Sequence, residues 1–174
     1  MGTLEDLEAR IAHLEKIIAP IERKNYSDSL VKNNIVLSCY GVCSKHKQSI
    51  GIIIRGVGLY QSLEISKLTS SEIYEEVCLD SIYQGIQSLV GLNLFKIKVP
   101  IIIHTNSRDV SSYINGNIKT KSEKLSKKIQ LIKNEIRALE LLREEKIEVE
   151  FKLDRETHDM YIASNLAYEV IEKQ

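Results

Sequence analysis

The sequence is poor in the features that mark secreted, membrane-spanning and disordered proteins. Its 174 residues include two prolines, eight glycines and no tryptophan, and no low-complexity tract, which argues against disorder. The three cysteines are an odd number and predict free thiols in a reducing compartment, so we expect an intracellular protein, cytoplasmic or nuclear. No apolar run approaches the roughly 20 residues that cross a bilayer, and the acidic, amphipathic N-terminus does not resemble a secretory signal.

Charge is balanced overall but uneven along the chain. Lys and Arg together number 24, as do Asp and Glu. Between residues 23 and 60 six basic residues accompany one acid, and between residues 96 and 133 nine accompany two. These blocks predict a local positive face that suits nucleic acid; the alternative is that the lysines only hydrate the surface.

An apolar stripe follows the N-terminal residues. Its members alternate three and four residues apart, which is the a/d spacing of a coiled coil: Leu4, Leu7, Ile11, Leu14 and Ile18. Thr3 can cap this helix, and Pro20 predicts that it ends near Ala19. The stripe either makes the chain a homo-oligomer or packs on the chain's own domain.

The chain is therefore expected to have three parts. Residues 1–22 form the amphipathic helix, residues 23–31 a linker, and residues 32–174 one globular domain. Within that domain, apolar periodicity and turn residues predict strands at 35–42, 50–57, 59–68, 99–104 and 147–153, and helices at 72–90, 109–114, 122–145 and 159–171. The order β-β-β-α-β-α-α-β-α predicts an α/β fold with a mixed five-stranded sheet and helices on both faces.

Short motifs in this order resemble the ribonuclease H-like family. Residues 49–55 (Ser-Ile-Gly-Ile-Ile-Ile-Arg) resemble its second strand, in which Gly precedes an apolar run that ends in Arg. Residues 103–116 are similar to its fourth strand and the helix after it, residues 147–152 to its fifth strand, and residues 157–167 to its last helix. The resemblance covers the chain from about Lys32 onward and implies a ribonuclease H-like domain.

The same resemblance implies where a catalytic site would lie. In that family four carboxylates hold two divalent metal ions that cleave the RNA strand of a hybrid, because Mg²⁺ prefers anionic oxygens. The matching positions here are Tyr40 (or Cys39, if the register shifts by one), Cys78, Asn106 and Asp159. Only Asp159 is acidic, and an acid there also suits the first turn of any helix.

The sequence thus predicts a catalytically inactive ribonuclease H-like domain, not an enzyme, with no metal and no cofactor. It would be a self-associating binding or assembly module whose further partner is nucleic acid, as RNA/DNA hybrid or duplex, or a protein. Candidate contacts to nucleic acid are Lys45, Lys47, Arg55 and Arg108. The alternative is an active metal-dependent nuclease with relocated carboxylates, for which the candidates are Glu75, Asp109 and Asp159.

Overall fold

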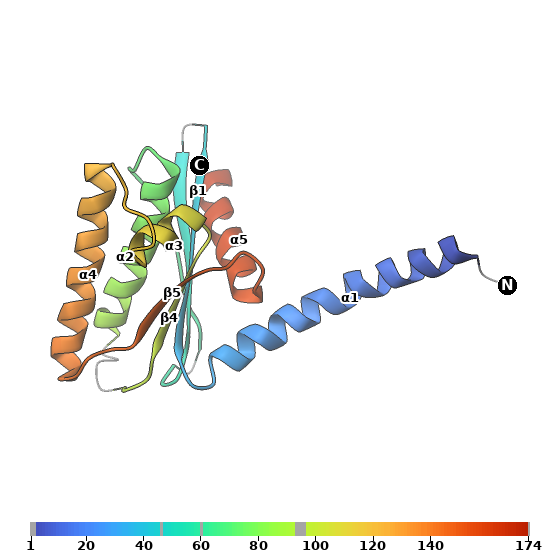
Figure 1. Cartoon of the computed structure of the whole chain (residues 1–174), viewed down its shortest axis with the longest axis horizontal. Coiled ribbons are helices and arrows are strands. Elements are labelled where there is room, and N and C mark those ends of the chain that lie inside the picture. Colours follow the sequence, from blue (N-terminus) through green and yellow to red (C-terminus); the bar gives the residue numbers. More distant parts are fainter. Residues whose placement is uncertain (1–2, 46, 60, 93–96, 174) are drawn as a thin grey trace.

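The chain folds into a five-stranded sheet with helices on both faces and a long N-terminal helix that projects from it (Figure 1). The computed structural model describes residues 3–45, 47–59, 61–92 and 97–173. The elements in chain order are α1 (Leu4–Leu30), β1 (Ile35–Ser44), β2 (Lys47–Gly56), β3 (Leu63–Thr69), α2 (Tyr74–Gly91), β4 (Ile101–Thr105), α3 (Arg108–Ile114), α4 (Glu123–Arg143), β5 (Val149–Leu153) and α5 (His158–Glu172).

The sheet has the strand order β3-β2-β1-β4-β5. The first three strands form an antiparallel meander, and β4 and β5 run parallel to β1. The inner strands β1 and β4 are buried on both faces, which explains why they appear in the sequence as nearly continuous apolar runs. The predicted mixed sheet is confirmed.

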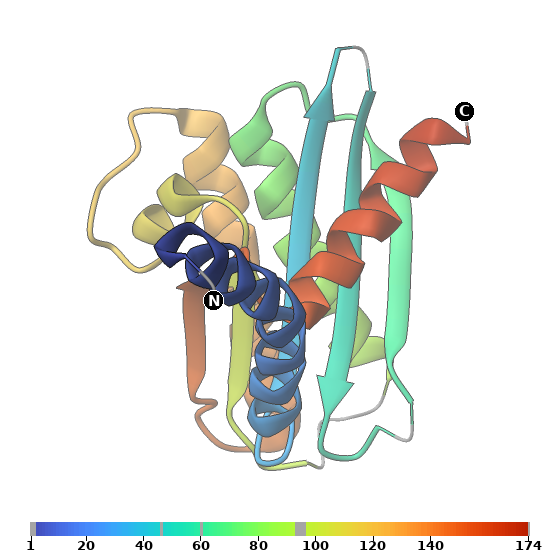
Figure 2. The ribbon, with the colours of Figure 1, turned by 90° about the vertical axis from the view of Figure 1, so that its right-hand side faces the viewer.

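Helices cover the two faces of the sheet unequally. On one face α2 packs against β1 and β2, with α4 outside it; on the other, α5 crosses β1, β2 and β3 (Figures 1 and 2). The α5 face depends on a close approach at Gly51, where a Cβ would lie 2.0 Å from the carbonyl oxygen of Ala163 and 2.7 Å from the backbone nitrogen of Ala167. No side chain fits there without moving α5 off the sheet.

Helix α1 corrects two expectations. It does not end near Ala19 but continues through Pro20 to Leu30, so the residues expected to form a linker are helical as far as position 30. Packing of its last turns explains the continuation: Ser27 is buried, and its Oγ accepts a hydrogen bond from the backbone N–H of Asp159 in α5 at 3.4 Å. Tertiary contacts here outweigh the helix-breaking tendency of proline. Over the part of the chain that the structure describes, no helix has the length and apolarity to cross a membrane.

The start of α2 corrects a third expectation. The helix begins at Tyr74 and not at residue 72, and its N-cap residue is Ile73, whose side chain makes no capping bond. The hydroxyls of Thr69 and Ser71 instead donate to the carboxylate of Asp80, which also binds Lys128 of α4. The hydroxyl segment therefore ties the end of β3 to α2 and α4.

Candidate functional site

The carboxyl ends of β1 and β4 form the candidate site, which we call the sheet tip: Tyr40, Gly41, Cys78 and Asn106. In the parallel pairing of these strands Cys39 lies opposite Thr105, so the next residues, Tyr40 and Asn106, come side by side. Side chains alternate along β1. Cys39 is fully buried among the core residues, whereas Tyr40 is only partly buried.

Cys78 reaches the sheet tip from α2 because Gly41 leaves room for it. A Cβ at position 41 would lie 2.9 Å from both the Sγ and the backbone nitrogen of Cys78. Burial is the main reason that the pKa of the Cys78 thiol is raised to about 12. The structure therefore brings Tyr40, Cys78 and Asn106 together, with a thiol that stays protonated at neutral pH.

The Asn106 side chain is the centre of the sheet tip. It is 3% exposed. Its Oδ1 accepts from the backbone N–H of Gly41 at 3.0 Å and from the Cys78 thiol at 3.4 Å, while its Nδ2 donates to the Gly41 carbonyl and to the Tyr74 hydroxyl, both at 2.9 Å. An amide satisfies this set because it is both donor and acceptor; an ionised carboxylate only accepts.

Two residues that bind Asn106 of the sheet tip were not predicted from the sequence. Tyr74, from the first turn of α2, also donates to the Asn106 carbonyl at 3.1 Å, and its own pKa is raised mainly by burial. Arg155, in the loop between β5 and α5, donates to the same carbonyl at 2.9 Å. Its guanidinium opposes the increase that burial causes in the pKa of Tyr40. The Arg155 side chain therefore supplies a positive charge beside the sheet tip.

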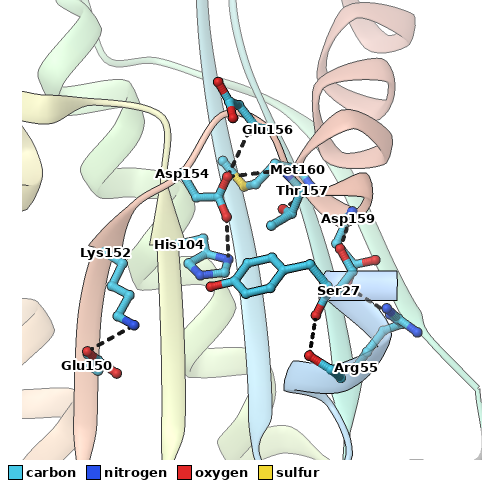
Figure 3. A network of polar contacts seen from close by, with 12 residues as sticks. Ser27, Arg55, His104, Glu150, Lys152, Asp154, Glu156, Thr157, Asp159 and Met160 are labelled. Carbon is cyan, nitrogen blue, oxygen red and sulfur yellow. Dashed lines mark hydrogen bonds and ion pairs between the residues drawn. The ribbon is translucent and has the colours of Figure 1, made fainter. Parts of the chain in front are cut away.

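Asp159 is bonded to residues outside the sheet tip. Its Oδ2 accepts from the Arg55 Nε at 2.8 Å (Figure 3). The same guanidinium reaches Asp28 of α1 at 3.1 Å. Arg55 is paired with Val36, which comes four residues before Tyr40 on β1. Asp159 is therefore part of the junction between α1 and α5, which we call the α1 junction: Ser27, Asp28, Arg55 and Asp159.

A buried histidine lies near the end of β4. His104 of β4 is 2% exposed, and its Nδ1 lies 3.6 Å from Asp154 (Figure 3). Asp154 itself accepts from the backbone N–H groups of Glu156 and Thr157 at 2.8 and 3.1 Å. Burial lowers the pKa of His104, and the charge of Asp154 opposes that change without reversing it. The imidazole is therefore neutral at pH 7.

The four basic residues proposed to contact nucleic acid are not in one place. Lys45 and Lys47 belong to the β1–β2 hairpin, and Arg108 starts α3 just after the end of β4, so these three lie toward the same end of the sheet. Arg55 lies near the other end of β2, where two carboxylates bind it. Lys45 and Arg108 are exposed.

The donors at the sheet tip do not fit a pair of magnesium ions. The tip offers a phenol, a protonated thiol and an amide already engaged on both atoms, whereas Mg²⁺ prefers carboxylate oxygens. Across the described residues, no three His, Cys, Asp or Glu side chains gather in a way that could hold a metal ion. The relocated set Glu75, Asp109 and Asp159 is thus not assembled either.

The fold itself has clear counterparts among solved structures. The ribonuclease H1 of the archaeon Halobacterium salinarum matches with a TM-score of 0.64 and 12% identity, over 81% of this chain and 99% of the other. The ribonuclease H domain of a Mycobacterium tuberculosis protein matches at 0.63 and 14%, over 81% and 95%. LC11 ribonuclease H1, solved with an RNA/DNA hybrid, matches at 0.64 and 17%, over 80% and 97%.

The chain has a ribonuclease H-like fold. At these identities the similarity establishes the architecture alone. No family model and no curated protein matches the sequence.

Proposed function

We propose that the chain is a non-catalytic ribonuclease H-like module that self-associates through α1. The observation that carries the loss of catalysis is the Asn106 amide, which donates to the Gly41 carbonyl and accepts from the Gly41 N–H. The family's metal ligand at this position would be an anion, and an anion cannot make the donated bond. Replacement of an acid by a neutral group that is fully hydrogen-bonded supports a structural role for the tip.

Self-association is supported by the stripe on α1. The five apolar side chains predicted to form a seam are between 45 and 72% exposed in the monomer. A contiguous apolar surface of this kind marks a site of association, and α1 extends away from the sheet, where a second chain can reach it (Figure 1).

Nucleic acid is a second candidate partner. Lys45, Lys47 and Arg108 lie toward one end of the sheet, and LC11 ribonuclease H1, which shares the fold, was solved with an RNA/DNA hybrid. A gel shift with hybrid, duplex and single-stranded probes at two salt concentrations tests this role. Binding through phosphate contacts weakens steeply with salt, so binding that ignores salt contradicts it.

The absence of catalysis is tested with an RNA/DNA hybrid and Mg²⁺ or Mn²⁺. We expect no cleavage above the buffer level. Cleavage that Asp159→Asn abolishes would overturn the proposal, because it would mean that the one acid retained from the family pattern supports a metal.

Light scattering over a concentration series tests self-association. We expect a mass of at least twice the 19.9 kDa of one chain. Leu14→Glu places a charge in the seam and should shift the chain to monomer, whereas Ala12→Glu adds the same charge off the seam and should not. A monomer at all concentrations for the unmodified chain contradicts the proposal.

A further inference from the structure

The seam of α1 is longer than its sequence pattern predicts, because the helix does not end at Pro20. Ile21, which is 56% exposed, and Asn25 continue the same spacing. The a positions are Leu4, Ile11, Ile18 and Asn25, and the d positions are Leu7, Leu14 and Ile21. The register now runs over about three heptads, the length at which a coiled-coil assignment becomes meaningful.

The domain of the same chain lies on a different side of α1. Pro20 and Arg23, at positions c and f, line a pocket together with His158 and Tyr161 of α5. Ser27, at another c position, is buried against α5. Positions c and f lie on the outer side of a heptad. The seam is consequently turned away from the α5 contact.

Charges beside the seam decide the orientation of a second copy. The e positions carry Glu8 and Glu22, and residue 15 between them is also Glu; the g positions include Arg10 and Lys24. In a parallel, in-register pair each g residue faces the e residue five positions further along the other helix, so Arg10 meets the acid at residue 15, whereas Lys24 meets Ser29. In an antiparallel pair e faces e and g faces g, so like charges meet. The parallel arrangement is the complementary one.

The residue types in the seam favour two strands. Ile at a with Leu at d is typical of parallel dimers, and one polar Asn at an a position fixes register and strand number at some cost in stability. Ile11 and Ile18 at a and Leu7 and Leu14 at d follow this pattern, Leu4 at a and Ile21 at d depart from it at the two ends of the seam, and Asn25 is the polar a residue. This pattern agrees with the orientation that the charges require.

We infer that α1 binds the α1 of a second copy as a parallel, in-register, two-stranded coiled coil. Each ribonuclease H-like domain then sits on the outer side of its own helix, at the same end of the dimer, so the two domains lie on opposite sides of the two-fold axis. The inference rests on the proposed self-association and adds its geometry.

Distances between spin labels test the geometry on the full chain. Glu5→Cys and Ala12→Cys, each in a Cys43→Ser background that removes the exposed native thiol, place labels at two b positions one heptad apart. A parallel, in-register dimer gives the same interlabel distance at both. An antiparallel pairing of the seam separates the Glu5 labels by roughly 20 Å more along the axis than the Ala12 labels, at 1.5 Å per residue.

Light scattering on the labelled proteins distinguishes a failure of the proposed self-association from a failure of its proposed geometry. A monomeric mass refutes self-association itself. A dimeric mass with unequal distances refutes only the parallel geometry, and a trimeric or larger mass refutes the two-stranded state.

A charge reversal provides an independent test. Arg10→Glu at position g should raise the dimer dissociation constant several-fold, because it faces an acidic e position of the second copy. Lys16→Glu makes the same change of charge at the outer position f and should leave the constant close to that of the unmodified chain. Equal effects of the two substitutions would contradict the pairing of g with e.

Discussion

Replacing Asn106 with aspartate restores the acid that the family pattern places at the end of β4, and we expect it to destabilise the fold. The amide donates to the Gly41 carbonyl and to the Tyr74 hydroxyl, both at 2.9 Å. A carboxylate donates to neither. The hydroxyl of Tyr74 can reorient toward the carboxylate, whereas the Gly41 carbonyl loses its donor and cannot turn.

The magnitude follows from these contacts. A buried carbonyl left without its donor costs about 1–3 kcal/mol. The new carboxyl group is also confined to a site where the native side chain is 3% exposed, and its ionised form pays a further desolvation penalty. Arg155, which binds the backbone carbonyl of residue 106, offsets part of that penalty. We expect Asn106→Asp to lower the free energy of unfolding by about 3 kcal/mol at pH 8.

The loss should depend on pH. Burial raises the pKa of the new carboxyl in the folded state above its unfolded value of about 3.9. As the pH rises past that value the unfolded state releases its proton first, so the variant loses stability between pH 4 and pH 8 relative to the unmodified chain. Urea unfolding followed by circular dichroism, at one protein concentration and at pH 5 and pH 8, measures the difference.

Asn115→Asp is the matched control. Asn115 also donates its Nδ2 to a backbone carbonyl, that of Phe151 at 2.9 Å, but it is exposed. Water replaces the lost donor there, so we expect a loss of no more than about 1 kcal/mol with little pH dependence. If Asn106→Asp is as stable as this control at both pH values, the hydrogen bonds of the amide do not determine the structure of the sheet tip.

Three further substitutions test the packing and charges around the two regions. Gly51→Ala should lower the free energy of unfolding in urea by at least about 2 kcal/mol, because its Cβ meets the backbone of α5. Gly91→Ala, whose Cβ would have nothing within 4 Å, should be neutral or stabilising. Equal effects of the two substitutions would contradict the close approach at Gly51. Arg55→Met should cost about 3–5 kcal/mol by leaving the buried Asp159 without its cation, and adding Asp159→Asn should recover part of it; no recovery would mean that the charge pair is not the cause. The pKa of His104 is lowered in the fold, so the unfolded state takes up its proton first and the free energy of unfolding falls as the pH drops below about 6.5. In His104→Gln the free energy of unfolding should therefore change less between pH 7 and pH 5. An unchanged pH dependence in this variant would refute the assignment.

Regular parts of the fold were predictable from local patterns. The apolar runs of β1 and β4 specified strands because inner strands are buried on both faces. Local signals failed where tertiary contacts decide. Pro20 disfavours a helix on its own, but α1 continues beyond it, where Ser27 contacts α5 and Asp28 binds Arg55 of β2. The hydroxyls of Thr69 and Ser71 suit a cap, but Asp80 provides them with a charged acceptor.

The candidate site was predictable to the same extent. The resemblance to the ribonuclease H-like family pointed to Tyr40, Cys78 and Asn106, and hydrogen bonding and close packing bring these residues together at the sheet tip. Arg155 gave no periodic signal, since it belongs to a loop whose path depends on β5 and α5. The ion-pair partner of Asp159 could not be predicted from the sequence either, because it depends on which residue of β2 lies against the first turn of α5.

The position of Asp159 connects the two proposals. In the family pattern an acid in the last helix serves a metal; in this chain that acid binds Arg55, which in turn binds Asp28 of α1, and the backbone N–H of Asp159 is bonded to Ser27. Two contacts that hold α1 against the domain, those of Asp28 and Ser27, thus go to the two members of one ion pair, Arg55 and Asp159. A helix that carries two domains in a dimer must be fixed to each of them, since a loose joint would leave their separation undefined. We therefore propose that Asp159, through Arg55 and Ser27, helps to fix the direction of α1 relative to the domain.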